Sequence, residues 1–298
     1  MNSGRLALFS KHLESVVFEN KLVKKISSSL ATKEDVAIFH DPSYIERVAR
    51  LSAIGEGYLD AGDTPAFRGV FEASLWVVGT TLACLDQIMQ VGSDVIHVFN
   101  PVGGLHHAWR SSAGGFCVFN DAAIAIEHAH RMNPSKDILY IDIDAHHGDG
   151  VYYCFEDQPW LYIVDVHEDG RYLYPGTGFK SETGIGAAKG TKINLPLPPH
   201  SGDKEFEDAF SEARTILEKV NPSLVVLQTG ADGLAGDPLT HLNYSGKVHR
   251  MVAEAIHEYC HKKSGGRLLV LGGGGYNPNN VRDAWVGVIE SLIKPIDG

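Results

Sequence analysis

Cysteine is scarce in this chain, and the cysteines that occur are scattered. They are Cys84, Cys117, Cys154 and Cys260. They show neither Cys-x-x-Cys spacing nor a disulfide framework, which argues against a small secreted domain held together by disulfides. Their distribution fits a reducing compartment, and we expect a cytoplasmic protein.

Basic residues, long apolar runs and linker segments are also lacking. Only 26 Lys and Arg stand against 37 Asp and Glu, so the net charge is −11 and a direct nucleic-acid partner is not expected. No signal-peptide pattern and no apolar run long enough to span a bilayer is present, so no membrane partner is expected. With no Pro/Ser-rich linker and no repeat, residues 1–298 are predicted to form a single domain.

Short apolar, β-branched segments alternate with amphipathic ones along the chain. The expected strands are Val95–Phe99, Ile138–Ile143, Leu161–Val166, Leu224–Leu227 and Leu268–Leu271. The expected helices include Val70–Met89, Asn120–Arg131, Phe206–Val220 and Ser245–Cys260. Strand-then-helix alternation predicts an α/β fold in which helices cover both faces of a parallel sheet.

Polar residues follow four of these strands at the point where each strand ends. The four loops contain Gly103–His107, Asp144–Asp149, Thr229–Gly233 and Gly272–Tyr276. Ligands of parallel sheets bind at the carboxyl ends of the strands, so these loops are predicted to converge on one site.

The segment Asp142-Ile-Asp-Ala-His-His-Gly-Asp149 carries three carboxylates and two imidazoles. Alternate residues of extended backbone share a face, so Asp142, Asp144 and His146 can point the same way. We predict that Asp144, His146 and Asp232 bind a catalytic divalent metal, because two carboxylates and one imidazole neutralise it and leave a position open for water. A solvated polar loop is the plainer alternative.

The tandem His106-His107 supplies acid–base capacity. Asp142 and Asp149 would each orient one imidazole, so that one ring stays neutral and the other is closer to protonated. Such a pair could remove a proton from water and return it to a leaving amine. The plainer interpretation is that one of the two histidines only packs in the core.

Tyr276 follows the four glycines Gly272–Gly275. A glycine run usually marks unusual backbone or close approach to a ligand. A phenol at its end could donate a hydrogen bond to a developing oxyanion. A phosphate-binding loop is the alternative, but no Lys-Ser/Thr follows the glycines.

These motifs together resemble the histone deacetylase family, whose prokaryotic relatives include acetoin utilization proteins and acetylpolyamine amidohydrolases. The resemblance runs from about Ala31 to the C-terminus. Besides the metal motif and the tandem histidine, it includes Gly62–Pro65, Ser112–Asp121, Tyr174–Gly178, Gly230–Pro238 and Gly272–Tyr276.

The resemblance implies an arginase-deacetylase fold with a central, mostly parallel eight-stranded sheet, and zinc-dependent hydrolysis of acyl-lysine amides. Fe(II) or Co would be alternative metals in vitro. Asp144, His146 and Asp232 match the zinc ligands. His107 with Asp149 matches the general base and acid, His106 with Asp142 its electrostatic partner, and Tyr276 the residue that polarises the carbonyl. Gly115, Phe116 and Tyr174 match the walls of the acyl-lysine tunnel, and Asp63 matches the rim carboxylate.

Three departures from the family pattern concern the edges of the site. The usual opening segment is reduced to His12-Leu-Glu-Ser15 at best, although Leu6–Phe9 could form an edge strand. Asp165 replaces a serine whose carbonyl helps to bind a structural potassium ion. Tyr174 stands where phenylalanine is common, and it adds a hydroxyl to the channel.

Rival functions differ at single positions. A binuclear manganese ureohydrolase shares the fold, but Gly148 and Gly230 replace two carboxylates of its second metal site. An inactive acyl-lysine binding module would lack a ligand, a tandem histidine or the tyrosine. Leu239 lies where some acetylpolyamine deacetylases carry glutamate, so acyl-lysine peptides or proteins are the expected partners, with small-molecule amides as the alternative.

Overall fold

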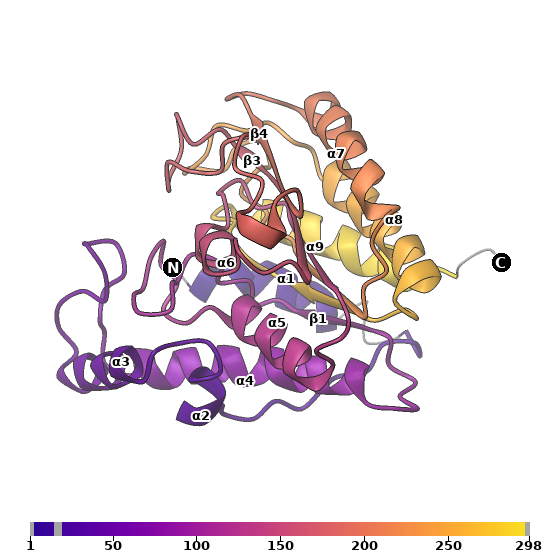
Figure 1. Ribbon diagram of the computed structural model, residues 1–298. Coiled ribbons are helices and arrows are strands. Elements are labelled where there is room, and N and C mark those ends of the chain that lie inside the picture. The colour runs from indigo at the N-terminus through magenta and orange to yellow at the C-terminus, as the bar shows by residue number, and fades with distance from the viewer. Residues whose placement is uncertain (1–2, 15–19, 296–298) are drawn as a thin grey trace.

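The computed structural model describes residues 3–14 and 20–295 and contains a parallel β-sheet covered by helices on both faces (Figure 1). The strands of this sheet are β1 (His97–Asn100), β2 (Ile138–Asp142), β3 (Leu161–Glu168), β4 (Lys192–Leu197), β5 (Leu224–Gln228) and β6 (Leu268–Leu271). Their order across the sheet is β1-β6-β5-β2-β3-β4, and every pairing is parallel. The α/β class is therefore confirmed.

The expectation of eight strands is wrong for the described residues, which form six. Leu6–Phe9, for which the sequence allows an edge strand, lies instead in η1 (Ser3–Leu6) and α1 (Ala7–His12). The physical reason is the spacing of the apolar residues. Leu6, Phe9 and Leu13 recur at helical intervals, and all three pack in the cluster around Trp285. The His12–Ser15 segment begins at the end of α1, and its Ser15 lies outside the described residues.

The two faces of β2 divide the core into two layers. Ile138 and Tyr140 pack on one side, while Leu139 and Ile141 pack on the other, as the two-residue period of a strand requires. The first layer holds α3 (Pro42–Ile54), α4 (Val70–Met89) and α5 (Asp121–Met132), and the second holds α7 (Asp203–Leu217) and α8 (Lys247–Lys263) (Figure 1). The remaining helices are α2 (Lys33–Val36), α6 (Asp149–Cys154), η3 (Gly186–Ala188) and α9 (Pro278–Leu292).

The longest helix, α4, begins and ends where the sequence predicts. Helix α5 starts one residue later than expected, because the Asn120 side chain caps it by accepting a hydrogen bond from the Ala123 amide at 2.9 Å. Within the described ranges, no helix combines the length and the apolar character needed to cross a membrane.

The register of the strands aligns their carboxyl ends. Asp142, the last residue of β2, pairs with Asp165 on one side and with Gln228 on the other. Gln228 in turn pairs with Leu271, the last residue of β6. The polar loops that follow β1, β2, β5 and β6 therefore leave the sheet at the same edge, as the sequence predicts.

Candidate metal centre and active site

A cavity of about 250 Å³ opens at this edge of the sheet. Segments far apart in the sequence contribute its walls. It is lined by eleven of the residues that the sequence singles out: Asp63, His106, His107, Gly115, Phe116, Asp144, His146, Tyr174, Asp232, Leu239 and Tyr276. The other two, Asp142 and Asp149, lie behind the tandem histidines, which they contact directly.

Three ligand-bearing side chains converge at the floor of the cavity. His146 Nδ1 lies 3.1 Å from Asp144 Oδ1 and 3.1 Å from Asp232 Oδ2. One ligand atom from each residue lies within 4.8 Å of the others, and all three residues are buried. Two carboxylates and an imidazole at this spacing suit a single divalent ion such as zinc.

The electrostatics of Asp144, His146 and Asp232 also favour a bound cation. Burial raises the pKa of Asp232 to about 7, and the negative charge of Asp144 adds to the effect. Burial alone would lower the pKa of His146, but the two carboxylates outweigh it and raise that pKa to about 10. Two buried carboxylates therefore depend on a positive charge between them, which a divalent ion would supply.

Hydrogen bonds from outside the group hold the two carboxylates in place. Asp144 Oδ2 accepts from the Gly274 amide and from Gln228 Nε2, both at 2.8 Å. Asp232 Oδ1 accepts from the Ala145 amide at 2.8 Å. Gln228 was not identified from the sequence, although a polar residue at the end of an apolar strand is the signal that could have found it.

Glycine leaves no room for a second metal ligand at either position that a binuclear site would need. A Cβ atom on Gly230 would lie 2.0 Å from Asp144 Oδ2, and one on Gly148 would lie 2.8 Å from Asp142 Oδ2. A carboxylate fits neither place unless Asp144 or Asp142 moves. The arrangement therefore favours a single metal over the pair of a ureohydrolase.

Each tandem histidine is oriented by its own carboxylate. His106 Nδ1 lies 2.8 Å from Asp142 Oδ2, and His107 Nδ1 lies 2.6 Å from Asp149 Oδ1. The two Nε2 atoms face one another at 3.1 Å. The expected pairing of each histidine with its own carboxylate is thus present. Because both Nδ1 atoms are engaged, Nε2 is the ring nitrogen that remains for the chemistry of the cavity.

The two imidazoles differ in charge. Burial would lower the pKa of His106, but Asp142 and Asp144 outweigh it and raise the pKa to about 10. Burial lowers the pKa of His107 to about 4, assisted by the positive charge of His106, although Asp149 opposes the shift. At neutral pH the pair therefore consists of a charged His106 and a neutral His107.

Three further residues support the pair and were not identified from the sequence. Tyr140 donates its hydroxyl to Asp142 at 2.6 Å, and Trp109 Nε1 donates to Asp149 at 3.0 Å. The Asn120 amide group donates to the carbonyl oxygen of His106 at 3.1 Å. These contacts hold Asp142, Asp149 and the His106 backbone on the side away from the cavity. No local sequence pattern indicates them.

The wall of the cavity beside His107 requires glycine at position 115. Gly115 has a φ of +51°, and a Cβ atom there would lie 2.3 Å from the Cδ2 atom of His107. Tyr174 closes the same wall, with its ring edge-on to His107 at a centroid distance of 5.1 Å. Phe116 faces Tyr276 across the cavity, with centroids 6.2 Å apart.

Tyr276 and the rim residues complete the cavity. The Tyr276 amide donates to Asp237 Oδ2 at 2.8 Å, which positions its ring against the cavity. Burial and the Asp232 and Asp144 charges raise the pKa of its phenol, so it keeps its proton. Asp63 and Leu239 are exposed at the rim.

Asp165 is buried beneath the site and already has a histidine partner. Its Oδ1 lies 2.6 Å from His167 Nδ1, and its Oδ2 accepts from the Gly148 amide at 2.9 Å. Burial opposes ionisation of Asp165, but His167 outweighs it and lowers the pKa of the carboxyl. The potassium site expected near this residue stays a prediction.

Comparison with known proteins places the chain among its relatives. The sequence model of the histone deacetylase domain matches residues 1–292. The acetoin utilization protein AcuC of Bacillus subtilis is 38% identical over 260 residues, which are 85% of this chain and 66% of that protein. The chain therefore spans about two thirds of the length of this relative.

Solved structures resemble the whole described fold. An HDAC homolog complexed with SAHA has a TM-score of 0.83 and 31% identity, covering 97% of this chain and 76% of that one. The HD domain of HDA15 has a TM-score of 0.86 and 27% identity, covering 98% of this chain and 84% of that one. With the domain match over nearly its full length, the chain belongs to the histone deacetylase family.

Proposed function

We propose that this protein hydrolyses the amide bond of N-ε-acyl-lysine side chains in peptides or proteins, with zinc as its metal. The observation that carries the proposal is the convergence of Asp144, His146 and Asp232 with the tandem histidines and the Tyr276 phenol in a single cavity. Membership of the histone deacetylase family supports the reaction class.

The metal would be held by Asp144, His146 and Asp232, whose spacing and negative charge fit a divalent ion. When bound, zinc supplies Lewis acidity, which polarises a carbonyl and lowers the pKa of water. Gln228 and the Gly274 amide keep Asp144 in position for this ligand set.

His107 is the proposed general base and acid. Its Nδ1 atom is engaged by Asp149, so the unprotonated Nε2 is the atom that takes a proton from the attacking water. The same nitrogen then delivers the proton to the leaving lysine amine. His106 stays protonated, and its charge stabilises the negative charge that develops on the substrate.

Tyr276 is the proposed donor to the developing oxyanion. Its phenol keeps its proton, and it lines the cavity together with the metal ligands. We expect Tyr276→Phe to lower kcat by about 10²–10³ while metal content stays normal, which is the usual effect of losing one oxyanion donor. Steady-state kinetics with metal analysis measures both. If only KM rose, Tyr276 would be a binding residue.

The cavity suits a narrow aliphatic stem. Phe116 and Tyr174 offer aromatic surfaces beside His107 and Tyr276, and apolar walls of this kind grip methylene groups and exclude water. A related HDAC homolog was crystallised in complex with SAHA. Asp63 at the rim is the proposed acceptor for the amides of the substrate backbone.

Leu239 is the residue that bears most directly on the choice between acyl-lysine and acetylpolyamines. It is 45% exposed at the cavity mouth and carries no charge to attract a second ammonium group. We expect the wild type to have a higher kcat/KM for acetyl-lysine peptides than for N-acetylputrescine or N-acetylspermidine. Leu239→Glu should shift that ratio toward the polyamines.

A substrate panel tests the proposed function. Acetyl-lysine peptides, longer acyl-lysine peptides and acetylated polyamines are compared by kcat/KM, with Leu239→Gln as the uncharged control for Leu239→Glu. A wild-type preference for polyamines would overturn the substrate class. Tight peptide binding without any turnover would instead favour an acyl-lysine binding module.

A further inference from the structure

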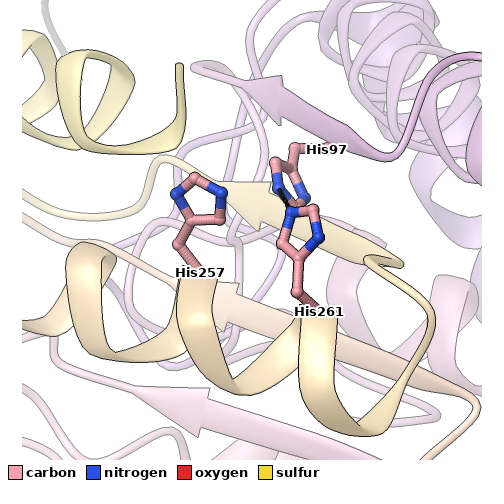
Figure 2. Close-up of side chains that lie close together, drawn as sticks. All are labelled: His97, His257 and His261. Carbon is pink, nitrogen blue, oxygen red and sulfur yellow. Dashed lines mark hydrogen bonds between the residues drawn. The ribbon is translucent and has the colours of Figure 1, made fainter. Parts of the chain in front are cut away.

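Three histidines lie close together at the end of the sheet opposite the cavity. His97 is the first residue of β1, and His257 and His261 lie one turn apart on α8 (Figure 2). His97 pairs with Leu268, the first residue of β6, which places the cluster at the amino ends of the strands. The cavity lies at their carboxyl ends, so the two groups of residues are separate.

The imidazoles are close enough to share one ion. His97 Nε2 lies 3.2 Å from His261 Nε2, and one ligand nitrogen from each of the three rings lies within 4.8 Å of the others. Two nitrogens bound to one tetrahedral zinc at about 2.0–2.1 Å are about 3.3–3.4 Å apart. Residues four apart on a helix share a face, which brings His257 and His261 to the same point.

His257 is held in the tautomer that a metal ligand needs. Its Nδ1 lies 2.9 Å from the Ser291 carbonyl oxygen, so Nδ1 carries the proton and Nε2 keeps a free lone pair. Metal-bound histidines commonly donate their second N–H to a backbone carbonyl in this way. His97 Nδ1, by contrast, is buried without a hydrogen-bond partner among the described residues.

The position of the cluster on α8 also favours a positive ion. His261 lies in the last turn of α8, where the negative end of the helix dipole favours a cation.

We propose that His97, His257 and His261 form a second metal site for a divalent transition metal, with zinc as its probe. Three imidazoles suit zinc, copper or nickel rather than magnesium or calcium, which prefer oxygen ligands. The exposed side of His261 leaves a fourth position to water. The ion would join the edge strand β1 to α8, so it stabilises the folded chain by binding only the native state.

Zinc stoichiometry of the full chain tests the proposal. Chelator-treated wild-type protein is incubated with zinc, passed through a desalting column and analysed for metal. We expect two zinc ions per chain in the wild type and one in His261→Gln. His128→Gln, which changes a partly exposed histidine on α5, is the matched control and should keep two. Because His261 is exposed, its variant is expected to fold, which circular dichroism checks.

A second arm isolates the site from the cavity. In Asp232→Asn, cobalt should still bind at the proposed tris-imidazole site and give visible absorption. Adding His261→Gln to this variant should remove the absorption. Zinc should raise the Tm of Asp232→Asn and leave that of the Asp232→Asn, His261→Gln double variant unchanged. Equal zinc content in the wild type and His261→Gln would overturn the proposal, as would a cobalt spectrum that persists in the double variant.

Discussion

Replacing Asp144 or Asp232 by asparagine is expected to remove the metal of the cavity and the turnover together. Each substitution takes one negative charge from the ligand set and leaves His146 with a single carboxylate at 3.1 Å. Asparagine keeps the size of the side chain, so the loss follows from charge rather than from packing. The ion would then lack the charge that balances it.

Metal analysis and kinetics on the same preparation measure this effect. Asp169→Asn is the matched control, because Asp169 is a largely buried carboxylate that binds Arg171 instead of the proposed metal. It should retain wild-type metal and kcat. Both measurements are best made in the His261→Gln background, where the second site is disabled. Full zinc content with near-normal turnover in Asp144→Asn would contradict the ligand assignment.

His107→Ala is expected to lower kcat by about 10²–10⁴, the usual contribution of a positioned general acid–base group. The change leaves Asp149 and the attacking water without their proton carrier. His106→Ala should cost less, because His106 acts through its charge and transfers no proton. It should also raise the pKa of His107, since the positive charge of His106 helps to lower it.

The pH dependence of kcat separates these roles. The His107 imidazole, with a pKa of about 4, is neutral at pH 7 and becomes protonated as the pH falls. The loss of wild-type activity on the acidic side should therefore lie well below neutral pH. His106→Ala should move that loss to higher pH. His107→Ala should abolish the ionisation, with metal content checked at each pH. An unchanged profile in His107→Ala would mean that another residue is the base.

Five of the six strands of the described sheet could be predicted from the sequence, and the edge strand β4 could not. The segments of β2, β5 and β6 are continuous apolar runs, because a parallel strand in the centre of a sheet is buried on both faces. Strand β4 was missed because Lys192 and Pro196 interrupt its pattern. Proline is tolerated there since β4 is an edge strand.

The cavity residues could be predicted because they follow strand ends in a parallel sheet, and this topology fixes where strand ends meet. Gln228, Tyr140 and Trp109 could not, since their importance comes from hydrogen bonds to Asp144, Asp142 and Asp149. Such bonds join residues that are distant in the sequence or that share a strand. Only the folded chain reveals them.

Metal titration of the chelator-treated His261→Gln variant tests the central proposal most directly. Turnover of an acetyl-lysine peptide is measured while zinc is added in steps. The proposed site at Asp144, His146 and Asp232 predicts no turnover without metal, a linear rise and a plateau at one zinc per chain. Turnover that persists in the metal-free protein, or a plateau that requires two zinc ions, would contradict single-metal amide hydrolysis in this cavity.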